Sequence, residues 1–439
     1  MSGPPVLLAA KRLHPDAASE GICTSRALHA MVDAGLDARV VTSDEASDAA
    51  GLRRALPWFT GPIDHVTTLP RRPVRGLRRR AWSAIDLAGT WVDGHPTWYR
   101  HSVSAWRHAL ERALATHRPQ VIVTRGAGGG FEPHLAMVDL DPDVPWIAHY
   151  HDPWPAIRWP APYRPASTRA LRRQEAGHER VLARADALTF PSARLRDWIV
   201  GGSPELEAKA HVVPHVIGPP TPPAGADPAL VATVGERPFT LVHTGTLLRH
   251  RRVGALVDAV AAFSERDEER RAATRLVLIG PADPAAFAGG GTDPASLEVD
   301  GRLVRAAARV DQASALGVAA AATADVLVEA PSDESPFFPG KLADYAGLGR
   351  PVLALTPRES VASDLMGEAH PLRVDPDDRE AIEGALEVLW DAHRHGRLDE
   401  LRLPTAGLGP LAPDIVGARL AELVRDLTGA PTTPAGSGS

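Results

Sequence analysis

The sequence contains a single cysteine, Cys23, among 439 residues. One thiol excludes an intrachain disulfide and any zinc knuckle built from cysteine pairs, and it fits a reducing compartment. Long apolar runs are also lacking, since none approaches the roughly 18 to 20 residues that a membrane-spanning helix needs. The short apolar run at residues 6–10 has no basic segment before it, so we expect no secretory signal. These absences predict a cytoplasmic protein whose membrane contacts are limited to the surface.

An excess of charge of one sign is lacking as well. The formal net charge is −6 over the whole chain, which gives no reason to expect nucleic acid as a partner. One segment departs from this balance, because six arginines and no acid lie between Arg71 and Arg80, with Trp82 and Trp91 close behind. Such a segment is commonly a solvated basic face. The alternative is peripheral contact with an anionic membrane or an anionic glycan.

Length and composition predict two folded domains. A chain of this length exceeds one ordinary hydrophobic core, and its 44% hydrophobic and 23% charged residues are typical of globular proteins. In the first half, apolar segments of strand length alternate with segments of helical spacing, as βαβ units do in a parallel sheet. The predicted strands are residues 5–10, 37–42, 120–124, 145–150, 187–190 and 211–216, and the predicted helices are residues 25–34, 106–116, 133–138 and 167–183.

A change of composition separates the two halves. Residues 217–238 hold six prolines without periodicity, which predicts a linker. A second βαβ series follows, with strands at 239–243, 275–279, 303–307, 325–329 and 351–355 and helices at 253–263, 312–322 and 341–348. The predicted organisation is an N-terminal Rossmann-like domain (1–216), the linker (217–238), a C-terminal Rossmann-like domain (239–410), a C-terminal helix packing back between the lobes (411–427) and a disordered tail (428–439).

Residues that directly follow strands are the first candidates for a site, because ligands of open α/β sheets bind at the carboxyl ends of the strands. The loop after the strand at 325–329 enters a helix near Gly340. Free N–H groups at a helix start suit a phosphate, and Lys341 adds a cation there.

The loop after the strand at 239–243 has similar chemistry. Gly245 permits close approach of a ligand, and Arg249, Arg251 and Arg252 supply cations around it. Two cationic loops at neighbouring strand ends predict a diphosphate site.

Both loops resemble the donor-binding motifs of the family 4 (retaining) glycosyltransferases of the GT-B fold. The matching segments are Thr244-Gly-Thr-Leu, with Arg251 six residues after the glycine, and Phe337-Phe-Pro-Gly-Lys-Leu-Ala-Asp-Tyr-Ala-Gly-Leu-Gly-Arg-Pro-Val. Supporting segments are Val212-Val-Pro-His-Val, Ala185-Asp-Ala-Leu-Thr-Phe-Pro-Ser and His151-Asp-Pro-Trp. The resemblance is strongest at residues 239–355. It implies an α/β fold of two Rossmann-like parallel-sheet domains that face each other across a cleft.

The resemblance also implies roles for individual residues of the second domain. Arg251 and Lys341 would bind the diphosphate and act catalytically by stabilising its growing charge. Asp344 would accept hydrogen bonds from the ribose hydroxyls. The remaining donor-binding residues are Gly245 and Thr246, together with the sugar-holding backbone of Phe338, Pro339 and Gly340.

In the first domain the resemblance singles out two positions. Gly21, in the loop after the first strand, corresponds to the family's glycine beside the donor phosphates. His151 corresponds to the histidine near the reacting sugar, with His149 as a nearby rival.

The chain departs from the family pattern at one point. The family usually has two glutamates eight positions apart, and these places hold Pro336 and Asp344. Aspartate keeps a carboxylate with a shorter reach, whereas proline removes it, so the identity of the donor sugar is left open.

Two other kinds of motif are weaker. Gly126-Ala-Gly-Gly-Gly follows a strand but lacks the spacing and the later acidic residue of a dinucleotide site. Asp139-Leu-Asp precedes a strand and Asp375-Pro-Asp has the form of a helix cap, so neither predicts a metal.

Together these patterns and the resemblance predict a glycosyltransferase, which the resemblance implies to be retaining and metal-independent. A nucleotide-diphosphate sugar is the expected donor substrate, no cofactor is expected, and the acceptor hydroxyl belongs to an unidentified carbohydrate, lipid-linked or small-molecule acceptor. The acceptor would attack from the face that the diphosphate leaves. The alternatives are a sugar-nucleotide-binding protein without transferase activity and a sugar-nucleotide epimerase on the same fold.

Overall fold

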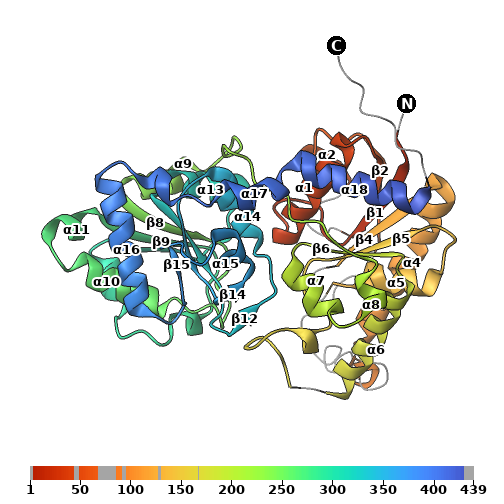
Figure 1. Ribbon diagram of the computed structural model, residues 1–439, viewed down its shortest axis with the longest axis horizontal. Helices are drawn as coiled ribbons and strands as arrows, with labels where there is room; N and C mark the ends of the chain where they lie inside the picture. Colours follow the sequence, from red (N-terminus) through yellow and green to blue (C-terminus); the bar gives the residue numbers. More distant parts are fainter. Residues whose placement is uncertain are drawn as a thin grey trace, which may run out of the picture. The chain divides into compact units, whose positions relative to one another are not determined.

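Strands and helices alternate along both halves of the chain and build two parallel sheets, each flanked by helices (Figure 1). The computed structural model describes residues 3–43, 49–67, 86–90, 95–126, 130–166 and 168–429. These fall into two compact units. The first comprises Met1–Trp159, Arg164–Val216 and Ala412–Ser439, and the second comprises Pro160–Tyr163 and Ile217–Leu411.

The first unit is built on a seven-stranded sheet of order β3-β2-β1-β4-β5-β6-β7, in which every neighbouring pair is parallel. Three of its inner strands, residues 121–126, 146–150 and 187–190, are buried along their whole length, as expected for a parallel sheet covered on both faces. The strands are β1 (Pro5–Ala10), β2 (Asp37–Thr42), β3 (Ile63–His65), β4 (Val121–Gly126), β5 (Trp146–Tyr150), β6 (Ala187–Phe190) and β7 (Ala210–Val212).

Helices cover both faces of this sheet. The last helix of the chain lies alongside the first, although the two are far apart in the sequence (Figure 1). Gly417 permits this contact, because a Cβ at this position would lie 2.3 Å from the Ala30 carbonyl oxygen. The helices are α1 (Ser19–Asp33), α2 (Ala49–Ala55), α4 (Thr97–His117), α5 (Glu132–Leu140), α6 (Arg169–Arg184), α7 (Ala193–Val200), α8 (Pro204–Glu207) and α18 (Pro413–Thr428).

The second unit is built on a six-stranded sheet of order β10-β9-β8-β11-β13-β15, again parallel throughout. A two-residue pair, β12 with β14, lies outside this sheet. The strands are β8 (Phe239–Thr244), β9 (Thr274–Ile279), β10 (Leu303–Ala306), β11 (Ala324–Val328), β12 (Glu334–Ser335), β13 (Val352–Leu355), β14 (Glu359–Ser360) and β15 (Arg373–Val374).

The helices of the second unit pack on both faces of its sheet, and they bury one large apolar core that includes Phe239, Phe263, Tyr345 and Trp390. They are α9 (Pro228–Gly235), α10 (Gly254–Ser264), α11 (Glu268–Ala273), α12 (Pro294–Val299), α13 (Gln312–Ala321), α14 (Gly340–Leu348), α15 (Val361–Met366), α16 (Arg379–Arg394) and α17 (Thr405–Leu408).

The predicted linker at residues 217–238 is in part wrong. This segment belongs to the second unit and contains α9, which packs against α13, and the Asp227 amide donates to Ser314 Oγ at 3.0 Å. Pro228 stands at the first helical position, where its missing N–H is harmless. The high proline content therefore predicted an irregular linker, although one of these prolines, Pro228, is the first residue of a helix.

Several predicted features lie outside the described residues. These are the arginine-rich segment from Arg71 to Arg80 with Trp82 and Trp91, residues 127–129 of the glycine-rich string, and residues 430–439 of the predicted tail. Among the residues that are described, no helix is long and apolar enough to span a bilayer.

Candidate functional site

In each sheet the strand order reverses at one point, and this is where ligands of such folds bind. In the second unit the reversal lies between β8 and β11, because the chain proceeds outward to β9 and β10 on one side and to β13 and β15 on the other. The loops after β8 and β11 therefore leave the sheet next to each other.

The side chain of Lys341 joins these two loops. Lys341 is the second residue of α14, and a Cβ at Gly245 would lie 2.5 Å from its Cε and 2.8 Å from its Nζ. Gly245 has φ +107°, a conformation that other residues rarely adopt. The glycine thus serves the turn and leaves room for the lysine, which agrees with the predicted convergence of the two loops.

A second cation lies beside Lys341. Burial, followed by the positive charge of Arg251, lowers the pKa of Lys341 from 10.5 to about 7, while Asp344 acts in the opposite direction. Lys341, in the first turn of α14, and Arg251 repel each other. An anion that also receives hydrogen bonds from the N–H groups of this helix start would neutralise both charges.

Tyr163 orients Arg251 and was not predicted. Its hydroxyl accepts a hydrogen bond from Arg251 Nε at 3.4 Å, and its ring makes edge contacts with His250 and Phe337. Tyr163 belongs to Pro160–Tyr163, the short piece of the first half that joins the second unit. No pattern in the sequence indicates that this piece leaves its own half.

The other two arginines of the predicted cationic loop have different surroundings. Arg252 pairs with Asp377 and Arg249 is exposed. All three arginines precede α10, and Arg251 is the one whose charge acts on Lys341.

The remaining predicted donor residues lie on the same two loops. Thr246 is exposed after Gly245, Pro339 precedes α14, Gly340 begins it, and Asp344 lies in it. Phe338, in contrast, is buried in the core with 4% exposure, so only its backbone is available to a ligand. The sugar-binding role that the resemblance implies for this backbone stays a prediction.

Pro336 is buried, and a buried carboxylate, that of Glu329, binds its neighbour Ser335. Glu329 directly follows β11 and accepts hydrogen bonds from Ser335 Oγ at 2.8 Å and Thr356 Oγ1 at 2.5 Å. Burial raises its pKa, although both hydroxyls and Arg251 act against this. Glu329 ties the 329–340 loop to the loop after β13, and its place directly after a strand is the signal that could have identified it.

In the first unit, the reversal lies between β1 and β4. His151 follows β5 and its amide donates to the Gly126 carbonyl at 2.9 Å. His149, the rival, lies deeper and its Nδ1 pairs with Thr189 Oγ1 at 3.1 Å. His151 is therefore the histidine nearer the strand end, with a pKa lowered by burial.

The prediction that Gly21 lies in a loop is wrong. Gly21 is in the first turn of α1, and a Cβ there would lie 2.2 Å from the His14 carbonyl oxygen. The side chain of its neighbour Glu20 is 12% exposed and lies near Arg12 and Asp152, and burial is the main cause that raises the pKa of Glu20 to about 8. Close packing of the backbone is a sufficient reason for the glycine.

In the two Asp-x-Asp strings, Asp139-Leu-Asp and Asp375-Pro-Asp, carboxylates form ion pairs or hydrogen bonds with other groups of the protein. Asp139 and Asp141 pair with Arg180 and Arg184. Asp375 accepts from the Asp377 amide at 2.9 Å, and Asp378, not Asp375, caps α16.

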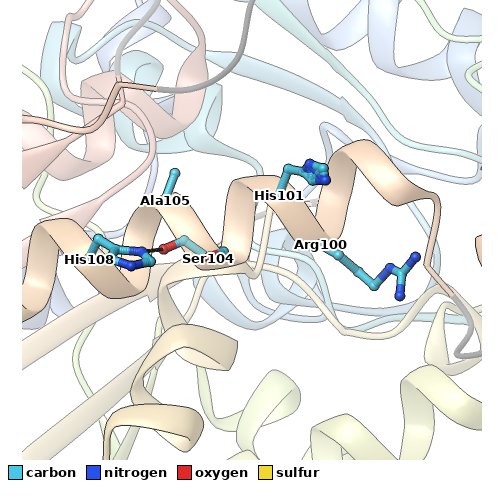
Figure 2. A pocket seen from close by; sticks show the side chains of 5 residues that line it. All are labelled: Arg100, His101, Ser104, Ala105 and His108. Carbon is cyan, nitrogen blue, oxygen red and sulfur yellow. Dashed lines mark hydrogen bonds between the residues drawn. The ribbon is translucent and has the colours of Figure 1, made fainter.

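A hollow of about 580 Å³ lies elsewhere in the first unit, on the outer face of α4. Its lining residues all belong to this helix, as Figure 2 shows: Arg100, His101, Ser104, Ala105 and His108. Because no second element of the described chain lines it, we assign it no role.

The two parallel-sheet units define the GT-B architecture, and solved structures of this architecture match nearly the whole chain. No family model matches the sequence, and no curated protein matches it in sequence. Sucrose-phosphate synthase from Thermosynechococcus elongatus matches with a TM-score of 0.62 and 16% identity over 98% of this chain and 100% of that one.

Two further structures match equally widely. An α,α-trehalose-phosphate synthase (UDP-forming) from Burkholderia xenovorans, in complex with glucose-6-phosphate, has a TM-score of 0.61 and 13% identity over 96% of this chain and 100% of that one. HepE of Anabaena, in complex with UDP and glucose, has a TM-score of 0.60 and 13% identity over 97% and 100%. At these identities the comparisons establish the fold.

Proposed function

We propose that this chain is a glycosyltransferase that moves a sugar from a nucleotide-diphosphate sugar to an acceptor hydroxyl, with retention of configuration. The observation that carries the proposal is the contact of Lys341 with Gly245, beside Arg251, at the start of α14. Both cations and the helix N–H groups suit a diphosphate, the group that leaves in such a transfer.

In this mechanism the protein acts mainly through electrostatics. Lys341 and Arg251 stabilise the negative charge that grows on the diphosphate as the glycosidic bond breaks. The acceptor hydroxyl attacks from the same face, and its proton passes to the leaving phosphate oxygen. Asp344 would hold the ribose, and His151 would contact the reacting sugar.

Neither a metal nor a cofactor is needed for these steps, because side chains and backbone N–H groups carry the compensating charge. Activity should therefore persist after chelation. Loss of turnover with a chelator, restored by magnesium or manganese, would contradict this part of the proposal.

The donor and acceptor are open, and the solved structures suggest where to begin. One of them holds UDP and glucose, and another holds glucose-6-phosphate. Sugar phosphates are therefore the first acceptors to test, followed by lipid-linked and free glycans. Peripheral membrane contact through Arg71 to Arg80 stays a hypothesis from sequence.

A thermal-shift screen of nucleotide sugars identifies the donor, because a ligand at 100 times its dissociation constant stabilises by roughly 2.7 kcal/mol. Release of nucleotide in the presence of each acceptor then measures transfer. Binding without release under all acceptors would favour a binding protein, the alternative that Pro336 supports. A changed sugar in the absence of acceptor would favour an epimerase.

A further inference from the structure

Three side chains of the first unit with metal-ligating atoms come together although they are far apart in sequence. Cys23 lies in the second turn of α1, His151 follows β5, and His215 follows β7. One ligand atom from each lies within 4.8 Å of the others, and all three residues are buried. Neither Asp-x-Asp string is part of this cluster.

The spacing is close to that of a metal site. Tetrahedral zinc, with bonds of about 2.0 to 2.3 Å, holds its ligand atoms about 3.3 to 3.7 Å apart. The three atoms would therefore have to approach by about 1 Å, which side-chain rotation can supply. The centroids of the imidazole rings of His151 and His215 are 4.5 Å apart, and the ring planes are tilted by 32°.

A second observation points to a ligand. Nδ1 of His151 is buried and has no hydrogen-bond partner among the described residues, although the residue is only 7% exposed. A buried polar atom without a partner is unfavourable by about 1 to 3 kcal/mol. A metal ion accepts the lone pair of a neutral imidazole and relieves this loss.

The chemistry of the donor set selects the kind of metal. One thiolate and two imidazoles suit zinc, whereas magnesium and calcium prefer oxygen ligands. Arg125 lies close and opposes a cation, but the Cys23 thiolate that forms on metal binding and the carboxylate of Asp152 lie in the same region and offset its charge.

Burial of histidine in this unit does not by itself create such a cluster. His134 and His178 are also buried, but they pack among the aromatic rings of Tyr150 and Trp154 with no cysteine nearby.

We infer that Cys23, His151 and His215 form a binding site for one Zn²⁺ ion. Binding releases the proton of the Cys23 thiol.

Occupancy of this site has a consequence that rests on the proposed function. His151 cannot ligate zinc and contact the reacting sugar at once, so Zn²⁺ inhibits transfer. The site is thus an inhibitory one, and it shares no residue with the donor-binding loops around Lys341.

The decisive experiment is a titration of the metal-free full chain with Co²⁺, followed by displacement with Zn²⁺. We expect one equivalent to bind, with the visible bands of tetrahedral cobalt and a sulfur-to-cobalt charge-transfer band, both abolished by Zn²⁺. Since Cys23 is the only cysteine, that band identifies the ligand without any variant. Absence of saturable binding, or binding without the charge-transfer band, overturns the site.

Variants complete the test. Cys23→Ser and His215→Asn should weaken Co²⁺ binding at least tenfold, whereas His395→Asn, at an exposed histidine of the second unit, should not. Circular dichroism confirms that each variant is folded, and a variant that does not fold leaves the wild-type titration to decide. Zinc binding without nucleotide release from any donor would sustain the site and contradict the proposed function. Transfer activity without zinc binding would do the reverse.

Discussion

At the scale of single residues, Lys341 and Arg251 are the side chains on which the proposed donor site depends. Replacing either with alanine should weaken nucleotide-sugar binding at least tenfold, about 1.4 kcal/mol, because a charge-assisted contact to the diphosphate is lost. Arg252→Ala is the matched control, since Arg252 pairs with Asp377 at the surface. Calorimetric titration measures all three. Unchanged affinity in both Lys341→Ala and Arg251→Ala would refute the assignment.

The lowered pKa of Lys341 predicts a pH dependence of donor binding. A pKa of about 7 means that the free protein carries a charged Lys341 below pH 7 and loses that charge above it. The diphosphate needs the charged form, so affinity should fall between pH 7 and 9, approaching tenfold per unit, with uptake of a proton on binding. A nucleotide sugar is the right probe, since its diphosphate does not titrate there. Lys341→Arg should flatten the profile, and a flat wild-type profile would contradict the prediction.

At the scale of elements, the turn after β8 must leave room for Lys341. Gly245→Ala should weaken donor binding at least tenfold, because the new Cβ would meet the lysine side chain in addition to straining the backbone. Gly289→Ala controls for strain alone, since Gly289 has φ +87° and open space around it. Both variants should lose thermal stability, but only Gly245→Ala should lose affinity. Equal loss of affinity in the two would mean that strain, not displacement of Lys341, is responsible.

Glu329 connects the loop after β11 to the loop after β13. Glu329→Ala should destabilise the fold by about 1 to 3 kcal/mol, because the buried hydroxyls of Ser335 and Thr356 lose their acceptor. Glu334→Ala is the control, at an exposed glutamate of the same loop. Denaturant unfolding compares the two. Equal stability of both variants would show that the carboxylate does not hold the loop.

At the scale of the whole molecule, buried neutral histidines should make the protein acid-labile. Burial lowers the pKa of six of them, to about 3 for His134 and below the ordinary 6.5 for the others: His149, His151, His178, His215 and His243. The unfolded chain therefore binds more protons, and stability present above pH 6.5 is lost as the pH falls below it. Each group contributes up to about 1.4 kcal/mol per pH unit.

Three buried carboxyls act with the opposite sign. The pKa values of Glu20, Asp325 and Glu329 are raised, so they destabilise the fold at high pH and less so as the pH falls. Six histidines outweigh three carboxyls between pH 6.5 and 4.5, and the melting temperature should fall steadily over this interval. His134→Phe should make the fall shallower, whereas His395→Asn, at an exposed site, should not. A melting temperature that is constant from pH 6.5 to 5 would contradict this account.

The sequence by itself determined the positions of most strands and long helices, since buried parallel strands appear as continuous apolar runs. It also identified the two cationic loops, because Gly245, Arg251 and Lys341 stand directly after strands or at a helix start. The GT-B fold predicted from the resemblance is confirmed. The features that the sequence did not predict lack a regular pattern. They are the helix that begins at Pro228, the inclusion of Gly21 in α1, and the short strands near the end of the second sheet.

Only the tertiary structure decided which distant groups meet. That Tyr163 reaches Arg251, and that Glu329 holds Ser335 and Thr356, depends on loop paths with no periodic signal. The Cys23, His151 and His215 cluster follows from the strand order of the first sheet, which brings the ends of separate strands together at one edge. The periodicity of a sequence indicates which face of a helix or strand is buried. Which strands pair with each other depends on the packing of the whole sheet, and this pairing brings the ligating side chains together.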